Sequence, residues 1–133
     1  MPISITERAI TICGIPNCST VKNARLWLDQ HAIAYTFHDF KKAGVDAALV
    51  ASWLPHLSLD VLINRKGTTW RALSDAQKAS VADQQQAIAL MMAQPSVIKR
   101  PVLMLDGKAY AGFSDALYQQ IFQQVFKVSG AQA

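Results

Sequence analysis

The chain of 133 residues lacks several features that would assign it to a common class at once. No apolar run reaches the roughly 18 residues that a membrane-spanning helix needs. Residues 1–8 are polar and carry no apolar signal segment, so a cytoplasmic protein is the default expectation. Only two cysteines occur, which is too few for a disulfide framework in a cytosolic protein.

Patterns typical of a metal site or a nucleic-acid surface are also missing. There is no C-x-x-C pair, and the three histidines form no ligand-spaced cluster with a further cysteine. The net charge is +4, but the lysines and arginines are scattered instead of forming a run or an aromatic-interleaved patch. We therefore expect no metal and neither nucleic acid nor membrane as a direct partner. The mild positive charge suits an anionic small substrate.

What is present indicates one folded domain over residues 1–133. The apolar fraction is 51% and the charged fraction 17%, so the chain can bury a core. Residues 8–13 are β-branched and apolar, as in a buried strand. After a loop containing Pro16, a helix that Ser19 or Thr20 could cap runs to about Gln30, and residues 34–39 alternate as a second strand. This strand–helix–strand order predicts a parallel βαβ unit.

The second half of the chain continues with helices and then returns to strands. Residues 45–54 predict a helix, residues 59–63 a short apolar stretch, and residues 76–92 either one long helix or two shorter ones. Residues 101–105 and 108–112 predict two strands joined by the turn Asp106–Gly107, before a closing helix over residues 114–126 that Ser114 could cap. The order predicts an α/β fold: a thioredoxin-like core with a mixed four-stranded sheet. Residues 1–42 and 96–128 form this core, and residues 43–95 form a helical insertion between the second and third strands.

The two cysteines have different settings. Cys18 stands where the helix begins, so backbone N–H groups and the helix dipole should favour its thiolate and lower its pKa. Lys22 and Arg25, one and two turns further, could add to the field. Cys13 ends an apolar strand, where burial makes a thiol inert. A disulfide between Cys13 and Cys18 is a minor alternative that would need the loop to move.

Three segments resemble one known family. They are GIPNCSTVKNARLWL, LINRKGTTWRAL and IKRPVLMLDGKAYAGF, within residues 10–122. Together they are similar to the ArsC-like arsenate reductases and their relatives, the Spx-type regulators and the YffB-like glutathione-linked proteins. The resemblance implies the fold described above. It also implies that Cys18 is the redox cysteine, that Arg65 and Arg100 bind an anion, and that the Arg100–Pro101 bond is cis.

Two departures from the family pattern bear on the substrate. ArsC-like arsenate reductases carry a third arginine just before the closing helix, where this chain has Gly112 or Phe113. A tetrahedral oxyanion would lose one charge partner there. Spx-type regulators that switch by an internal disulfide use C-x-x-C, and here Val21 stands three residues after Cys18. The GFS sequence after the hairpin instead resembles the YffB-like branch.

The resulting prediction is a glutathione-dependent thiol reductase with a single nucleophilic cysteine, Cys18. Glutathione would be the co-substrate, glutaredoxin a further partner, and a small-molecule or protein thiol the substrate. Arg65, Arg100, Lys22 and Asn17 are the candidate substrate- or anion-binding residues, and Pro101 the cis-proline. Two alternatives stay open. One is an arsenate reductase coupled to glutathione and glutaredoxin, and the other is an Spx-like regulator that binds RNA polymerase without enzymatic activity.

Overall fold

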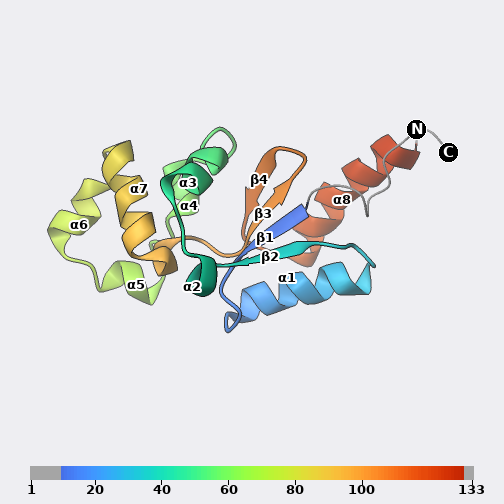
Figure 1. Cartoon of the computed structure of the whole chain (residues 1–133), viewed down its shortest axis with the longest axis horizontal. Helices are drawn as coiled ribbons and strands as arrows, with labels where there is room; N and C mark the ends of the chain where they lie inside the picture. Colours follow the sequence, from blue (N-terminus) through green and yellow to red (C-terminus); the bar gives the residue numbers. More distant parts are fainter. Residues whose placement is uncertain (1–9, 131–133) are drawn as a thin grey trace.

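A four-stranded sheet forms the centre of the computed structural model (Figure 1), which describes residues 10–130, and the side chains of residues 10–124. The strands are β1 (Ile10–Gly14), β2 (Thr36–Asp39), β3 (Val102–Leu105) and β4 (Lys108–Ala111), in the order β2-β1-β3-β4. β1 pairs parallel to β2 and antiparallel to β3, and β3 pairs antiparallel to β4. The predicted fold class is thus confirmed. The predicted start of the first strand, residues 8 and 9, lies outside the described residues.

Two helices cover one face of the sheet, α1 (Ser19–Gln30) and α8 (Asp115–Gly130). Strands and helices share a buried cluster on this face, which we call the α1/α8 face: Ile10, Ile12, Ala24, Trp27, Leu28, Ile33, Leu103, Leu105, Tyr118, Ile121 and Phe122. The indole nitrogen of Trp27 donates to Oδ1 of Asp115 at 2.7 Å. This bond joins α1 to the first turn of α8, so the two helices are held by a polar contact as well as by burial.

The helical insertion lies between β2 and β3 and extends to the left in Figure 1. Its elements are α2 (Phe40–Ala43), α3 (Ala47–Trp53), α4 (Leu59–Leu62), α5 (Thr68–Arg71), α6 (Asp75–Ser80), α7 (Gln84–Ala93) and the 3₁₀ helix η2 (Pro95–Val97). For residues 76–92 the sequence predicts either one long helix or two shorter ones, and the structure has two. Ser74 begins α6 with a capping box, and Asp83 begins α7 by accepting from the N–H of Gln86.

The insertion covers the other face of the sheet with a second buried cluster. Cys13, Val102 and Ala109 of the sheet pack there with insertion residues such as Trp53 and Met91. Backbone pairing also joins the insertion to the segment before β3: Ile63 and Ile98 form an antiparallel bridge, and the N–H of Lys99 donates to Leu62 at 2.7 Å. The segments that precede Arg65 and Arg100 are therefore held side by side.

The turn between β3 and β4 and the start of α8 form as the sequence predicts. Asp106 and Gly107 adopt φ of 52° and 76°, which suits a two-residue turn between twisted strands. The N–H of Leu117 donates to Oγ of Ser114 at 3.0 Å, so Ser114 caps α8 as predicted. None of the helices within residues 10–130 has both the length and the apolar character needed to cross a membrane.

Candidate active site

Cys18 occupies the N-cap position of α1. Its backbone is extended, with φ −96° and ψ 126°, and its carbonyl accepts from the N–H of Lys22 at 2.9 Å. The prediction that Ser19 or Thr20 caps this helix is wrong, because Ser19 is already the first helical residue. The N-cap side chain is normally an oxygen that accepts from the free N–H groups of the first turn. Here a sulfur takes that position.

The environment of Cys18 favours its anion. Partial burial acts to raise the pKa of the thiol, but hydrogen bonds from the backbone N–H groups of Val21 and Thr20, together with the charge and a hydrogen bond of Arg100, outweigh burial and lower the pKa. Groups that lower the pKa of a thiol stabilise its charged form, which is the nucleophilic one.

Arg100 reaches the thiol from the segment that leads into β3. Its Nη1 donates to the carbonyl of Ser96 at 3.3 Å, which holds the guanidinium in place. Its Nε is buried and has no hydrogen-bond partner in the described part of the chain. The peptide bond from Arg100 to Pro101 is cis. The Arg100 side chain as a whole is half-buried, so an anionic group of a ligand could bind to the accessible part of its guanidinium.

Gly14 allows α1 to begin close to the sheet. A Cβ on Gly14 would lie 2.8 Å from Cγ2 of Val21, a distance that side chains do not tolerate. The antiparallel register that pairs Cys13 with Val102 places Gly14 level with Pro101 on the neighbouring strand. The close approach at Gly14 therefore brings the first turn of α1, and Cys18 with it, next to the segment that carries Arg100.

Cys13 lies on the opposite face of the sheet, in the core. It is fully buried, its Sγ lies 3.7 Å from Sδ of Met104, and both cysteines are free thiols. Desolvation by burial raises the pKa of Cys13 to about 12. The surroundings thus raise the pKa of Cys13 and lower the pKa of Cys18.

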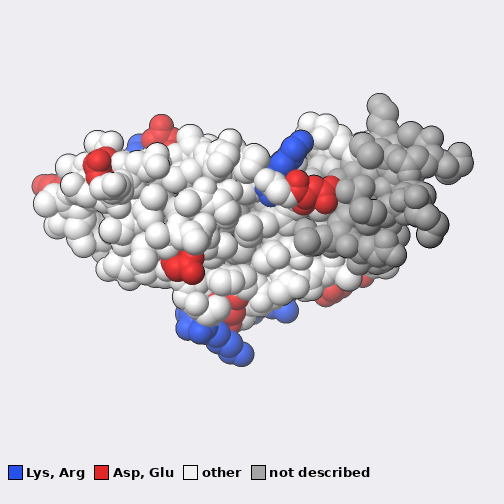
Figure 2. Space-filling model, turned by 45° about the horizontal axis from the view of Figure 1, so that its top comes forward, with Lys and Arg blue, Asp and Glu red and all other residues white. Residues whose placement is uncertain are grey.

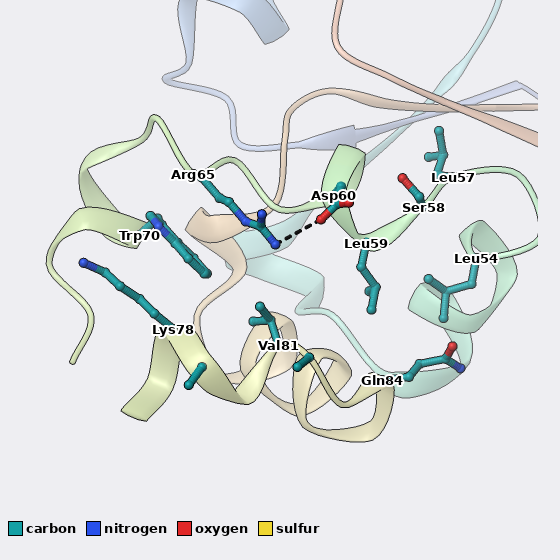
Figure 3. A pocket seen from close by; sticks show the side chains of 12 residues that line it. Leu54, Leu57, Ser58, Leu59, Asp60, Arg65, Trp70, Lys78, Val81 and Gln84 are labelled. Atoms are coloured by element: carbon teal, nitrogen blue, oxygen red, sulfur yellow. Dashed lines mark ion pairs between the residues drawn. The ribbon is translucent and has the colours of Figure 1, made fainter. Parts of the chain in front are cut away.

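Arg65 lines a cavity of about 740 Å³ within the insertion (Figure 3). Its guanidinium pairs with Asp60 at 3.0 Å and stands over the indole of Trp70 at 5.5 Å. Of the two predicted arginines, Arg100 is the one that lowers the pKa of Cys18. The proposed anion-binding role of Arg65 stays a prediction.

Asn17 and Lys22 flank Cys18 with exposed side chains, Asn17 in the preceding turn and Lys22 one turn into α1. Neither is among the groups that change the pKa of Cys18, so their role in substrate binding also stays a prediction. Arg25 points away from the thiol. Its Nε donates to the hydroxyl of Tyr35 at 3.1 Å, and its guanidinium lies 4.1 Å from the centre of the Phe37 ring.

The residue patterns did not single out Lys99. Gly112 has φ of 84°, in the region that favours glycine, and a Cβ there would lie 3.0 Å from Cε of Lys99. The side chain of Lys99 therefore covers Gly112, one of the two positions, with Phe113, at which the family resemblance expects a third arginine. In the sequence, the only sign of a role for Lys99 is that it directly precedes Arg100 in the KRP motif.

Within residues 10–130 no group of three or more His, Cys, Asp or Glu side chains could hold a metal ion. Lysine and arginine side chains stand in a few separate places on the face that Figure 2 shows, without a continuous basic patch.

The four-stranded mixed sheet with its helices defines a thioredoxin-like protein. In this fold a cysteine with a lowered pKa stands at a helix start, and an arginine precedes a cis-proline. The chain belongs to the ArsC family, whose model matches residues 13–121. The match begins within β1 and ends within α8, so it contains Cys18, Arg65 and Arg100.

Individual relatives agree with this assignment. An uncharacterized protein of Haemophilus influenzae is 40% identical over 113 residues, which cover 85% of this chain and 98% of the relative. The solved structure of the YFFB protein is 46% identical, with a TM-score of 0.79 over 84% of this chain and 97% of its own. An arsenate reductase (ArsC) related protein from Brucella melitensis is 48% identical, with a TM-score of 0.68 over 86% of this chain and 94% of its own.

Proposed function

We propose that the protein is a glutathione-dependent thiol reductase in which Cys18 is the only nucleophile. One observation carries the proposal: the thiol of Cys18 is held between backbone N–H groups of α1 and the guanidinium of Arg100, which together lower its pKa. The thiolate is the form that attacks a disulfide sulfur. Membership of a family that includes arsenate reductase-related proteins supports an oxidoreductase.

The reaction proceeds in two exchanges. The Cys18 thiolate attacks the glutathione sulfur of a mixed disulfide, R–S–S–G, forming a Cys18–glutathione disulfide and releasing R–S⁻, which takes a proton from water. A second glutathione, as its thiolate, then attacks the glutathione sulfur of the adduct. This step releases Cys18 as thiolate and forms glutathione disulfide. In sum, the mixed disulfide R–S–S–G and one glutathione give R–SH and glutathione disulfide, so that the R sulfur is reduced and the sulfur of the incoming glutathione is oxidised.

An external thiol is needed because Cys13 cannot serve as the resolving group. It is fully buried on the other face of the sheet, and its raised pKa keeps it protonated. Glutathione suits the site because its carboxylates can pair with the half-buried guanidinium of Arg100. The proposal places the protein in a reducing compartment such as the cytoplasm, with glutaredoxin as an alternative source of the second thiol.

Mass spectrometry after exposure to glutathione disulfide tests the proposal. We expect one glutathione adduct on Cys18 in the wild-type protein and in Cys13→Ala, and none in Cys18→Ser. The Cys13→Ala variant is the matched control, since it removes a thiol of the opposite character. Absence of the adduct from the wild-type protein, or an equal amount on Cys13, would overturn the proposal.

Arsenate reduction by the same Cys18 is the second candidate, favoured by the name of the Brucella melitensis relative. The sequence argues against it, because Gly112 or Phe113 stands where the family's third arginine is expected, and Gly112 is covered by the side chain of Lys99. An assay with arsenate, glutathione and glutaredoxin should give little or no turnover. Rapid turnover would make arsenate the substrate and would assign its binding to the remaining cations.

A further inference from the structure

Two glycines flank Pro101 at one end of the sheet. The register of β1 with β3 places Gly14 level with Pro101, and the N–H of Gly112 donates to the carbonyl of Pro101 at 2.8 Å on the other side. Residues level with one another on neighbouring strands face the same way. Neighbouring strands are about 4.8 Å apart, so Gly14 and Gly112 are roughly 10 Å apart.

Each glycine is covered by a side chain from another segment. Gly14 is covered on the α1/α8 face, because Ile12 precedes it by two residues in β1 and packs in that cluster. Val21 of α1 lies over Gly14, and the side chain of Lys99 lies over Gly112. The first turn of α1 and the side chain of Lys99 therefore stand on either side of Pro101.

The amine of Lys99 is available to a ligand. Its Nζ would lie 3.7 Å from a Cβ at Gly112, the side chain is exposed, and it makes no ion pair with any residue in the range 10–130. A larger residue at 112 would displace it and would also be strained by the positive φ. Glycine at this position thus lets a lysine from the adjoining segment place a charge beside the site.

We propose that Lys99 binds a carboxylate of the disulfide that Cys18 attacks, and so selects acidic thiol compounds over neutral ones. The inference rests on the proposed function, since it needs a disulfide bound at Cys18. Arg100 acts on the reacting sulfur, whereas Lys99 is a specificity residue for a charged group of the substrate.

The test compares two disulfides that react with Cys18 by the same exchange. Glutathione disulfide carries carboxylates and hydroxyethyl disulfide carries none. The rate of adduct formation on Cys18 is measured for both in the wild-type protein, Lys99→Gln and Lys99→Arg. Lys108→Gln is the control, because Lys108 is exposed at the opposite end of β4 and its loss changes the net charge equally.

We expect Lys99→Gln to slow the reaction with glutathione disulfide by about three- to fivefold, the size of one exposed charge pair. The reaction with hydroxyethyl disulfide should stay unchanged, Lys99→Arg should restore the selectivity, and Lys108→Gln should resemble the wild type. If Cys18 of Lys99→Gln still reacts and still prefers glutathione disulfide over hydroxyethyl disulfide, the role of Lys99 is overturned while the proposed function stands. A wild-type Cys18 that reacts with neither disulfide would overturn the proposed function together with this inference.

Discussion

Arg100 contributes both its charge and a hydrogen bond to the thiol of Cys18. The two residues are distant in sequence but near in space, because Cys18 follows β1 and Arg100 precedes β3, and these strands are neighbours. The thiolate is thus stabilised from two directions, by the first turn of α1 and by a guanidinium that Ser96 holds in place. The reactivity of the thiol should depend on both.

Removing the guanidinium should raise the pKa of Cys18. In Arg100→Gln, the rise of the alkylation rate with pH should move to higher pH, because the thiolate is the reacting form. At neutral pH, alkylation by iodoacetamide should slow by about three- to tenfold, because the thiolate loses a hydrogen bond from a charged group and less of it is present. The more basic thiolate is a better nucleophile, which offsets part of this loss. Arg65→Gln is the matched control and should leave the profile unchanged, because Arg65 pairs with Asp60 in the insertion. An equal effect of both substitutions would show that only net charge matters.

Cys13 should be inert in the folded protein. Its pKa of about 12 keeps it a thiol at neutral pH, and it is fully buried beside Met104. Peptide mapping after alkylation should find label on Cys18 alone under native conditions and on both cysteines in concentrated urea. Urea unfolding should also find Cys13→Ser less stable than Cys13→Ala by about 1–2 kcal/mol, because serine buries a hydroxyl. Native labelling of Cys13 would mean that the core opens far more often than its packing implies.

The contact between Gly14 and Val21 should appear as coupling in a double-mutant cycle. Gly14→Ala places a Cβ 2.8 Å from the Val21 side chain and should cost about 1–3 kcal/mol of unfolding free energy. In the Val21→Ala background the same substitution should cost clearly less, since the clashing methyl is gone. Additive effects of the two substitutions would place α1 further from β1 than described.

The bond between Trp27 and Asp115 should contribute to the packing of α1 against α8. Asp115→Ala leaves the buried indole N–H without its acceptor and should lower the unfolding free energy by about 1–2 kcal/mol. Asp115→Asn keeps an acceptor oxygen and should cost less. Gln119→Ala is the control, because Gln119 only donates to the other carboxylate oxygen from an exposed position, and it should change stability by less than about 0.5 kcal/mol. If Gln119→Ala lowered the unfolding free energy as much as Asp115→Ala does, the stabilisation would come from the surface contact between Asp115 and Gln119 and not from the bond to Trp27.

Patterns local in sequence predicted most of the fold. The β-branched run before Cys13, the Asp106–Gly107 turn and the cap at Ser114 each depend on neighbouring residues, and all three appear in the structure. The placement of Cys18 at a helix start followed in the same way. The capping residue of α1 was misassigned because polar residues follow one another there, and any of them satisfies the general preference for a cap.

Long-range partners were beyond the reach of such patterns. Arg65 pairs with Asp60 because the chain turns back after α4, and Lys99 covers Gly112 because the β3–β4 pairing brings those segments together. Residue patterns could not predict which of the two arginines lowers the pKa of the thiol. The family resemblance named both. In the structure Arg100 lowers the pKa of Cys18, and Arg65 lines the insertion cavity.

The pKa of the Cys18 thiol in the wild-type protein tests the central claim most directly. It is measured as the midpoint of the pH dependence of iodoacetamide alkylation at Cys18, followed by peptide mass spectrometry so that Cys13 does not contribute. We predict a midpoint clearly below about 8.5, the value of an unperturbed cysteine. A midpoint at or above that value would mean that neither α1 nor Arg100 stabilises the thiolate, which would contradict the account.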